Sequence, residues 1–153
     1  MTAQPIEGTP ALRRESRRRR PADAAHGSTF TSLGVPAPLA AALTAAGIDV
    51  PFPIQAAVLP DALAGADILG RGQTGSGKTL GFCIPLAARL ADGHTSAGRP
   101  RGLVLVPTRE LASQVQNVLR PLARAVGLKV ATIYGGTPQR PQVTALHLSL
   151  IHI

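Results

Sequence analysis

Several residue types are scarce in this chain of 153 residues, and each shortage excludes something. Cys83 is the single cysteine, so the chain can form no internal disulfide, and we expect a reducing, cytoplasmic compartment. No run of about 18 apolar residues is present, so we expect no membrane span. The N-terminus lacks the apolar stretch of a secretory signal. Because aromatic residues make up only 3% of the chain, its core must consist of Ala, Leu, Val and Ile.

Acidic residues are scarce too, and their distribution is uneven. The chain has 8 Asp and Glu residues against 16 Lys and Arg, a formal net charge of +8, and no acid follows Glu110. Residues 11–20, "ALRRESRRRR", carry most of the N-terminal charge, so we predict that residues 1–27 form a disordered basic tail. The tail either contacts phosphate backbones nonspecifically or is a solvated segment with no particular role.

From Phe30 onward the chain alternates helical and strand-like segments. Helix formers with terminal proline and glycine signals predict helices over 36–47, 54–65, 78–91 and 108–127. Short apolar runs predict buried strands over 66–70, 102–107 and 128–136. Because the strands are apolar throughout and helices separate them, the pattern indicates an α/β fold with a parallel sheet covered on both faces. Ligands are then expected at the carboxyl ends of the strands.

The stretch "GRGQTGSGKT" (70–79) follows a predicted strand and opens a predicted helix. Its spacing, Gly72-x-x-x-x-Gly77-Lys78-Thr79, lets backbone N–H groups point at phosphates, because glycine permits the φ values required. The positive end of the helix adds to this attraction. Lys78 can reach the β- and γ-phosphates, and the Thr79 hydroxyl can bind Mg²⁺. The sequence therefore predicts a P-loop nucleotide site. The alternative is a glycine-rich turn that binds nothing.

Neighbouring stretches resemble the motifs of DEAD-box RNA helicases. "GIDVPFPIQ" (47–55), with Phe30 upstream, resembles the Q motif, and "GQTGSGKT" (72–79) resembles motif I. "PTRELA" (107–112) resembles motif Ia, and Gly135 with Gly136 resembles the glycine doublet. The order and spacing are similar to the first RecA-like domain of that family over residues 28–146. The resemblance implies a truncated, parallel-sheet P-loop NTPase (RecA-like) domain that uses ATP and Mg²⁺.

The resemblance also implies roles for single residues. Gln55 would read the adenine edge and Phe30 would stack on the base, although Gln55 could be a surface residue and Phe30 a core residue. Lys78 and Thr79 would be catalytic, Thr79 as the Mg²⁺ ligand, and the ATP phosphates would be held by Gly72, Gln73, Thr74, Gly75, Ser76, Gly77, Lys78 and Thr79. The RNA backbone would be contacted, whatever its sequence, by Pro107, Thr108, Arg109, Gly135 and Gly136. Arg109 could instead pair with Glu110, and the glycine pair could be a plain turn.

Two small departures from the family pattern lie close to the nucleotide motifs. Phe52 stands where the Q motif usually has a hydroxyl residue, which is expected to weaken hydrogen bonding around Gln55. Gly72 replaces a commoner alanine, a mild change in a loop that requires flexibility.

A larger departure concerns the missing carboxylates. The family's Asp-Glu-Ala-Asp box, which should hold Mg²⁺ and position the attacking water, is absent, and so is the second RecA-like domain. We therefore expect residues 28–146 to be part of an ATP-dependent RNA helicase and to be unable to hydrolyse ATP alone. Residues 147–153 are expected to be a non-native read-through tail, with a natural apolar strand as the alternative. Two other functions stay open, a non-enzymatic nucleotide- or nucleic-acid-binding module and a DNA-directed P-loop helicase.

Overall fold

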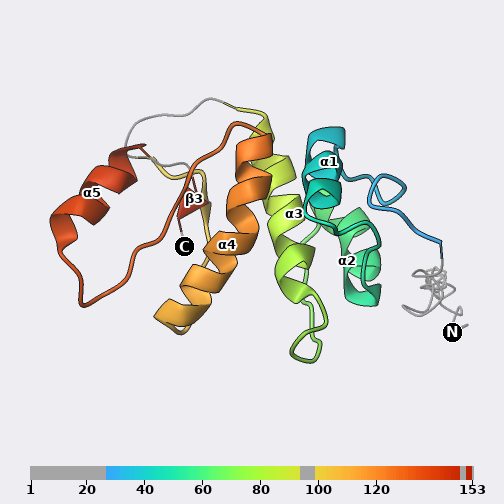
Figure 1. Ribbon diagram of the computed structural model, residues 1–153, viewed down its shortest axis with the longest axis horizontal. Coiled ribbons are helices and arrows are strands. Elements are labelled where there is room, and N and C mark those ends of the chain that lie inside the picture. The colour runs from blue at the N-terminus through green and yellow to red at the C-terminus, as the bar shows by residue number, and fades with distance from the viewer. Residues whose placement is uncertain (1–26, 94–98, 149–150, 153) are drawn as a thin grey trace, which may run out of the picture.

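The computed structural model describes residues 27–93, 99–148 and 151–152, so residues 1–26 of the predicted basic tail lie outside the described part of the chain. Figure 1 shows the arrangement of the elements. Within the described residues they are, in order, α1 (Ala37–Ala45), α2 (Pro53–Leu63), α3 (Lys78–Ala91), β1 (Gly102–Leu103), α4 (Arg109–Ala125), β2 (Val130–Ala131), α5 (Gln139–Leu148) and β3 (Ile151–His152).

The four predicted helices are confirmed as α1 to α4, and their ends follow the local signals. Gly47 and Gly65 come just after α1 and α2 with φ values of +71° and +96°, the left-handed conformation that glycine adopts without a steric penalty. The Thr108 hydroxyl accepts a hydrogen bond from the Leu111 N–H at 3.2 Å, so Thr108 is the N-cap of α4 as expected. Helix α5 was not predicted.

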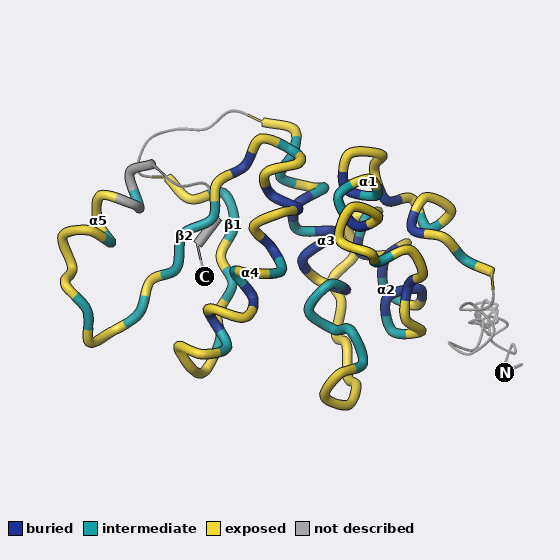
Figure 2. The backbone as a smooth tube through the Cα atoms, viewed as in Figure 1, coloured by how far each residue is buried: buried dark blue, intermediate teal, exposed yellow. Residues whose placement is uncertain are grey.

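A helical core positions these elements. Side chains from α1 to α4 meet with almost no solvent exposure, and the largest of them are mainly aliphatic, as the composition predicted: Leu39, Leu43, Leu59, Ile84, Leu119 and Leu122. Figure 2 shows the buried residues on the inward faces of these helices. Helix α3 packs against both α2 and α4, so the loop that precedes α3 is anchored to a rigid part of the molecule.

The predicted parallel sheet is only partly formed, and its strands are shorter than expected. Each strand has two residues, and the order β1-β3-β2 is parallel throughout. Residues 66–70 form no strand, and Leu69 in that segment is fully exposed. A strand requires a hydrogen-bonded neighbour, and the described residues place no strand beside 66–70. The predicted strands 102–107 and 128–136 shorten for the same reason.

The middle strand β3 comes from the predicted read-through tail. Ile151 pairs with Gly102 of β1 and with Val130 of β2. Two unpaired strand edges will accept any extended segment whose backbone is free, so this pairing does not reveal where residues 147–153 come from. Their non-native origin stays a prediction.

Three loops lie at one end of the molecule. Figure 1 shows that the loop before α3, the start of α4 and the loop after β2 all point toward its lower edge. These are the segments 70–77, 107–109 and 132–138, which carry most of the predicted site residues. The fold therefore gathers them without a complete sheet beneath them.

Candidate nucleotide and RNA site

The loop before α3 has the backbone shape of a phosphate cradle. Gly75 and Gly77 have φ values of +81° and +85°, and Gly77 is the left-handed N-cap of α3. A Cβ placed on Gly77 would lie 2.5 Å from Cδ2 of Phe52 and would also collide with Nε2 of Gln55. Only glycine fits there, so the backbone N–H groups of the loop and the positive end of α3 stay accessible to an anion.

Lys78, the first residue of α3, lies back over this loop. Its ammonium donates to the Gly72 carbonyl at 2.7 Å, to the Gln73 carbonyl, and to the Ser76 hydroxyl at 3.4 Å. All three acceptors belong to the loop itself. A phosphate bound by the loop would therefore compete with these oxygens for the same positive charge.

Gln55 connects the start of α2 to the start of α3. Its side chain is 2% exposed, which excludes the alternative of a surface residue. Its Oε1 atom accepts from the Phe52 N–H at 2.9 Å, and its Nε2 atom donates to the Gly77 carbonyl at 3.0 Å. One N–H and one lone pair of the carboxamide remain for another partner. Phe52 stands where the family usually has a hydroxyl residue, but Gln55 keeps this hydrogen bond because the donor is the backbone N–H of Phe52.

The two phenylalanines of this region are placed differently. Phe30 is 4% exposed and belongs to the core cluster, so its predicted stacking on a base stays a prediction that requires the ring to leave the core. Phe52 is 53% exposed and lies against the phosphate loop at Gly77. The structure thus brings Phe52, and not Phe30, to the surface beside the predicted site.

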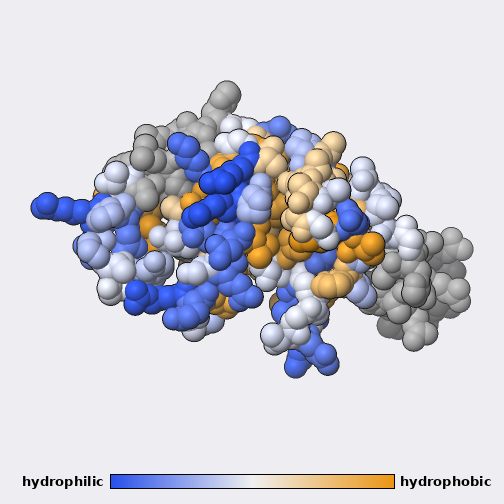
Figure 3. All heavy atoms as spheres, in the orientation of Figure 1, coloured by the Kyte–Doolittle hydropathy of each residue, from blue (hydrophilic) through white to orange (hydrophobic). Residues whose placement is uncertain are grey.

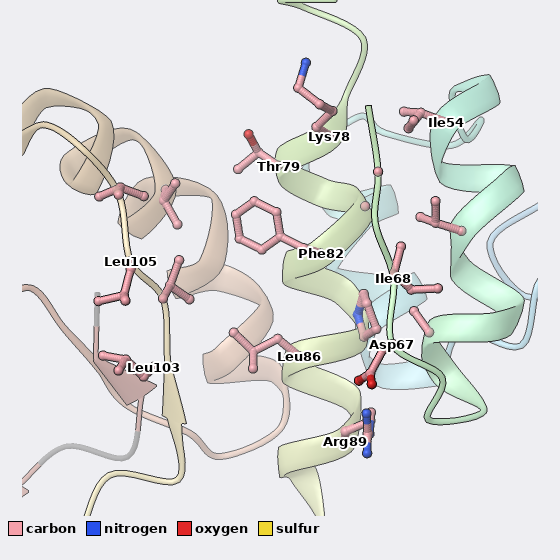
Figure 4. Close-up of a pocket in the computed structure, with 18 of the residues that line it drawn as sticks. Ile54, Asp67, Ile68, Lys78, Thr79, Phe82, Leu86, Arg89, Leu103 and Leu105 are labelled. Carbon is pink, nitrogen blue, oxygen red and sulfur yellow. The ribbon is translucent and has the colours of Figure 1, made fainter. Parts of the chain in front are cut away.

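An apolar groove of about 870 Å³ begins at the phosphate loop. Lys78 and Thr79 lie at one end of it, and Figure 4 shows Phe82 and Leu86 of α3 projecting between residues 66–70 and β1. Most of the groove is hydrophobic and unsuited to phosphate, so only its end at Lys78 and Thr79 matches a nucleotide.

The predicted RNA-binding segments lie side by side. The Arg109 guanidinium lies 4.8 Å from the centroid of the Tyr134 ring, a cation–π contact. A Cβ placed on Gly136 would be 3.3 Å from Nη1 of Arg109, so the glycine leaves room for the guanidinium. Arg109 therefore stacks on Tyr134 and does not depend on Glu110 for a partner.

Sequence reasoning missed Tyr134 and Gln142. The Gln142 side chain accepts from the Tyr134 N–H at 2.9 Å and donates to the Tyr134 carbonyl at 3.2 Å, as a neighbouring strand would. It also donates to the Thr137 hydroxyl at 2.8 Å. An aromatic residue directly before the glycine pair was a usable signal for Tyr134. Gln142 gave none, because most of its partners are backbone groups.

The charge of the described residues is divided between two regions. Residues 27–93 contain four acids and three basic residues, whereas residues 99–148 contain a single acid, Glu110. The basic residues of 99–148 are Arg99, Arg101, Arg109, Arg120, Arg124, Lys129 and Arg140. Figure 3 shows hydrophilic side chains gathered over α4 and α5 and hydrophobic ones over α1 to α3. The RNA-binding prediction thus falls on the basic region.

Other features add little chemistry to the site. Burial raises the pKa of the Cys83 thiol from 9.0 to about 12, so the group is inert at neutral pH. In the described part of the chain, no cluster of three or more His, Cys, Asp or Glu side chains could hold a metal ion. Nor does any helix there have the length and hydropathy to cross a bilayer.

The fold and the site place this chain among the P-loop domains of RecA-like architecture. Residues 52–153 match the DEAD/DEAH box helicase family, and the chain belongs to that family. It is 44% identical over 120 residues to the ATP-dependent RNA helicase DeaD of Escherichia coli (strain K12), covering 78% of this chain and 19% of that protein. It is 38% identical over 120 residues to the pre-mRNA-processing ATP-dependent RNA helicase PRP5 of Mycosarcoma maydis, covering 76% and 10%.

A solved structure agrees with these relatives. The RNA helicase Prp28 from Chaetomium thermophilum bound to ADP superposes with a TM-score of 0.71 at 36% identity, over 78% of this chain and 30% of that one. The chain spans 10 to 20% of the length of the curated relatives it matches. It corresponds to part of the first RecA-like domain of a DEAD-box RNA helicase.

Proposed function

We propose that the protein is a cytoplasmic ATP-dependent RNA helicase, in which ATP binding and hydrolysis drive the unwinding of RNA duplexes. The observation that carries this proposal is the loop before α3. Its left-handed Gly77 has no room for a side chain, and Lys78 follows at the start of the helix. The Gln55 side chain holds this turn by donating a hydrogen bond to the Gly77 carbonyl. The relatives, which are named as ATP-dependent RNA helicases, support the same function.

The residues present fit the phosphates of ATP and could supply one ligand, the Thr79 hydroxyl, to Mg²⁺. The loop N–H groups from Gly75 to Gly77 would bind the phosphates, Lys78 would neutralise the β- and γ-phosphates, and Thr79 would give its hydroxyl to the metal. Bound Mg²⁺ and ATP supply the activated phosphoryl group. Gln55 would use its remaining N–H and lone pair on the adenine edge.

RNA would bind along the edge made by Pro107, Thr108, Arg109, Gly135 and Gly136. The positive end of α4 and the Arg109 guanidinium favour phosphate, and Gly136 leaves room for close approach. These groups contact the backbone and read no base. The binding should therefore be independent of sequence and should weaken as salt rises.

Residues 1–153 alone should bind nucleotide weakly and should not hydrolyse it. Phosphoryl transfer to water requires a group that positions the water and further ligands for the metal. No carboxylate follows Glu110, and none of the eight acids belongs to an Asp-Glu-Ala-Asp sequence. Hydrolysis is thus proposed only for the full-length protein.

The nucleotide assignment can be tested with two substitutions in the full-length protein. Lys78→Ala should abolish ATP turnover, because it removes the ammonium that lies over the loop, whereas Lys129→Ala, beyond the end of α4, should leave turnover intact. Gln55→Ala should reduce the preference for ATP over GTP. Normal turnover by the Lys78 variant would overturn the proposal.

The RNA assignment requires a separate measurement. ATP turnover should rise on addition of RNA and not of DNA of the same length, and Arg109→Ala should raise the RNA concentration needed for half-maximal stimulation. Stimulation by DNA alone would favour the DNA-directed alternative, and RNA binding without any turnover would favour a binding module.

A further inference from the structure

Two side chains press against the backbone of Gly77, and only one of them reaches solvent. Gln55 is 2% exposed and has one hydrogen bond to the backbone at each end of its carboxamide. The ring of Phe52 contacts the same glycine with about half of its surface open. A ligand seated on the phosphate loop and extending toward α2 would therefore meet the Phe52 ring first.

An exposed aromatic ring at this position is unusual for a helix N-cap. Phe52 precedes α2 and makes no side-chain capping hydrogen bond, so the ring does not serve the end of the helix. A Cβ placed on Gly77 would lie 2.5 Å from Cδ2 of Phe52, so this edge of the ring occupies the space beside the glycine. One edge of the ring thus adjoins the loop while about half of the residue is open to solvent, which suits a planar partner.

We propose that Phe52 is a ligand-binding residue whose exposed ring forms the platform on which the base of the bound nucleotide stacks. This inference rests on the proposed ATP binding. It assigns the stacking role to Phe52 because the aromatic residue expected to stack, Phe30, is buried in the core. Every base has a flat π-face, so the platform adds affinity for nucleosides without choosing among them, and that choice falls to Gln55.

The experiment compares ATP with inorganic tripolyphosphate, which carries the same phosphate chain and no base. Both are titrated calorimetrically, with Mg²⁺, into the full-length protein and its Phe52→Ala variant. Loss of one base–aromatic stack should weaken ATP binding about tenfold and leave tripolyphosphate binding unchanged. Phe52→Tyr, which keeps a ring, should bind ATP as the wild type does.

Val50→Ala is the matched control, because Val50 is an exposed apolar residue in the same segment, and the atoms nearest to a Cβ built on Gly77 belong to Phe52 and Gln55 instead. It should change neither affinity. The inference is overturned if Phe52→Ala leaves ATP binding unchanged, or if both ligands weaken equally, since the ring would then only support the loop. If Lys78→Ala leaves tripolyphosphate binding intact, the proposed phosphate site itself fails, and the two failures are distinguishable.

A spectroscopic readout separates stacking from support. The chain contains no tryptophan, so Phe52→Trp places a single indole of this chain beside the loop. Its emission, taken as a difference from the wild-type protein, should be quenched by ATP and not by tripolyphosphate. Equal responses to both ligands would show that the ring senses the phosphates and not the base.

Discussion

Replacing Gln55 with leucine should loosen the attachment of α3 to the rest of the molecule. Leucine keeps most of the volume but removes the acceptor for the Phe52 N–H and the donor to the Gly77 carbonyl, bonds of 2.9 and 3.0 Å. A backbone group deprived of its partner costs about 1 kcal/mol when water can partly reach it. Two such groups give about 2 kcal/mol, or a change of about 30-fold in the population of the opened state.

Cys83 provides the assay, because it lies on the same helix and its side chain is fully buried. A thiol reagent reaches it only when α3 opens, so the labelling rate of the peptide that contains Cys83, followed by mass spectrometry, reports that opening. Gln55→Leu should speed labelling about 30-fold. Gln114→Leu, an exposed glutamine on α4, is the control and should label as the wild type does. A Gln55→Leu rate within twofold of the control would refute the reasoning.

Three further predictions concern the core and the RNA edge. Leu119→Ala should lower the free energy of unfolding by about 2–5 kcal/mol, because Leu119 is fully buried, whereas Leu105→Ala, at a largely exposed site, should change it by less than about 0.5 kcal/mol in urea denaturation. The pKa of Cys83 is about 12 in the folded protein and 9.0 unfolded, so stability should be complete below pH 9 and fall as pH rises toward 12, by at most about 1.4 kcal/mol per pH unit. Cys83→Ala should remove this slope, and an identical slope in that variant would contradict the assignment. Tyr134→Leu removes the ring under Arg109 and should weaken RNA binding several-fold in fluorescence anisotropy with ATP affinity unchanged; a loss of both would point to a folding defect instead.

Local signals in the sequence were enough for the helices and for the phosphate loop. Gly47, Gly65 and Thr108 each act within a few residues, through a left-handed backbone or one capping hydrogen bond, so their effect can be read without knowing the fold. The same holds for Gly77 and Lys78, whose roles depend on the turn into α3. These parts of the structure agree with the sequence analysis.

Features that depend on distant partners could not be read in this way. Residues 66–70 have the composition of a strand but find no neighbour in the described residues, so their apolar side chains stay exposed. The contact of Gln55 with Gly77 joins residues 22 positions apart, and the Arg109–Tyr134 contact likewise crosses between two elements. Such contacts follow from the packing of the helices and leave no periodic trace in the sequence.

The hydrogen bond between Gln55 and Gly77 couples the binding of a base to the binding of phosphates, so that each affects the other. A base that attracts the carboxamide must share it with the turn before α3, and a triphosphate that reshapes that turn must disturb the carboxamide. Adenosine and tripolyphosphate, offered as separate molecules, should therefore alter each other's affinity by the same factor. The free energy of binding ATP is then not the sum of its two halves.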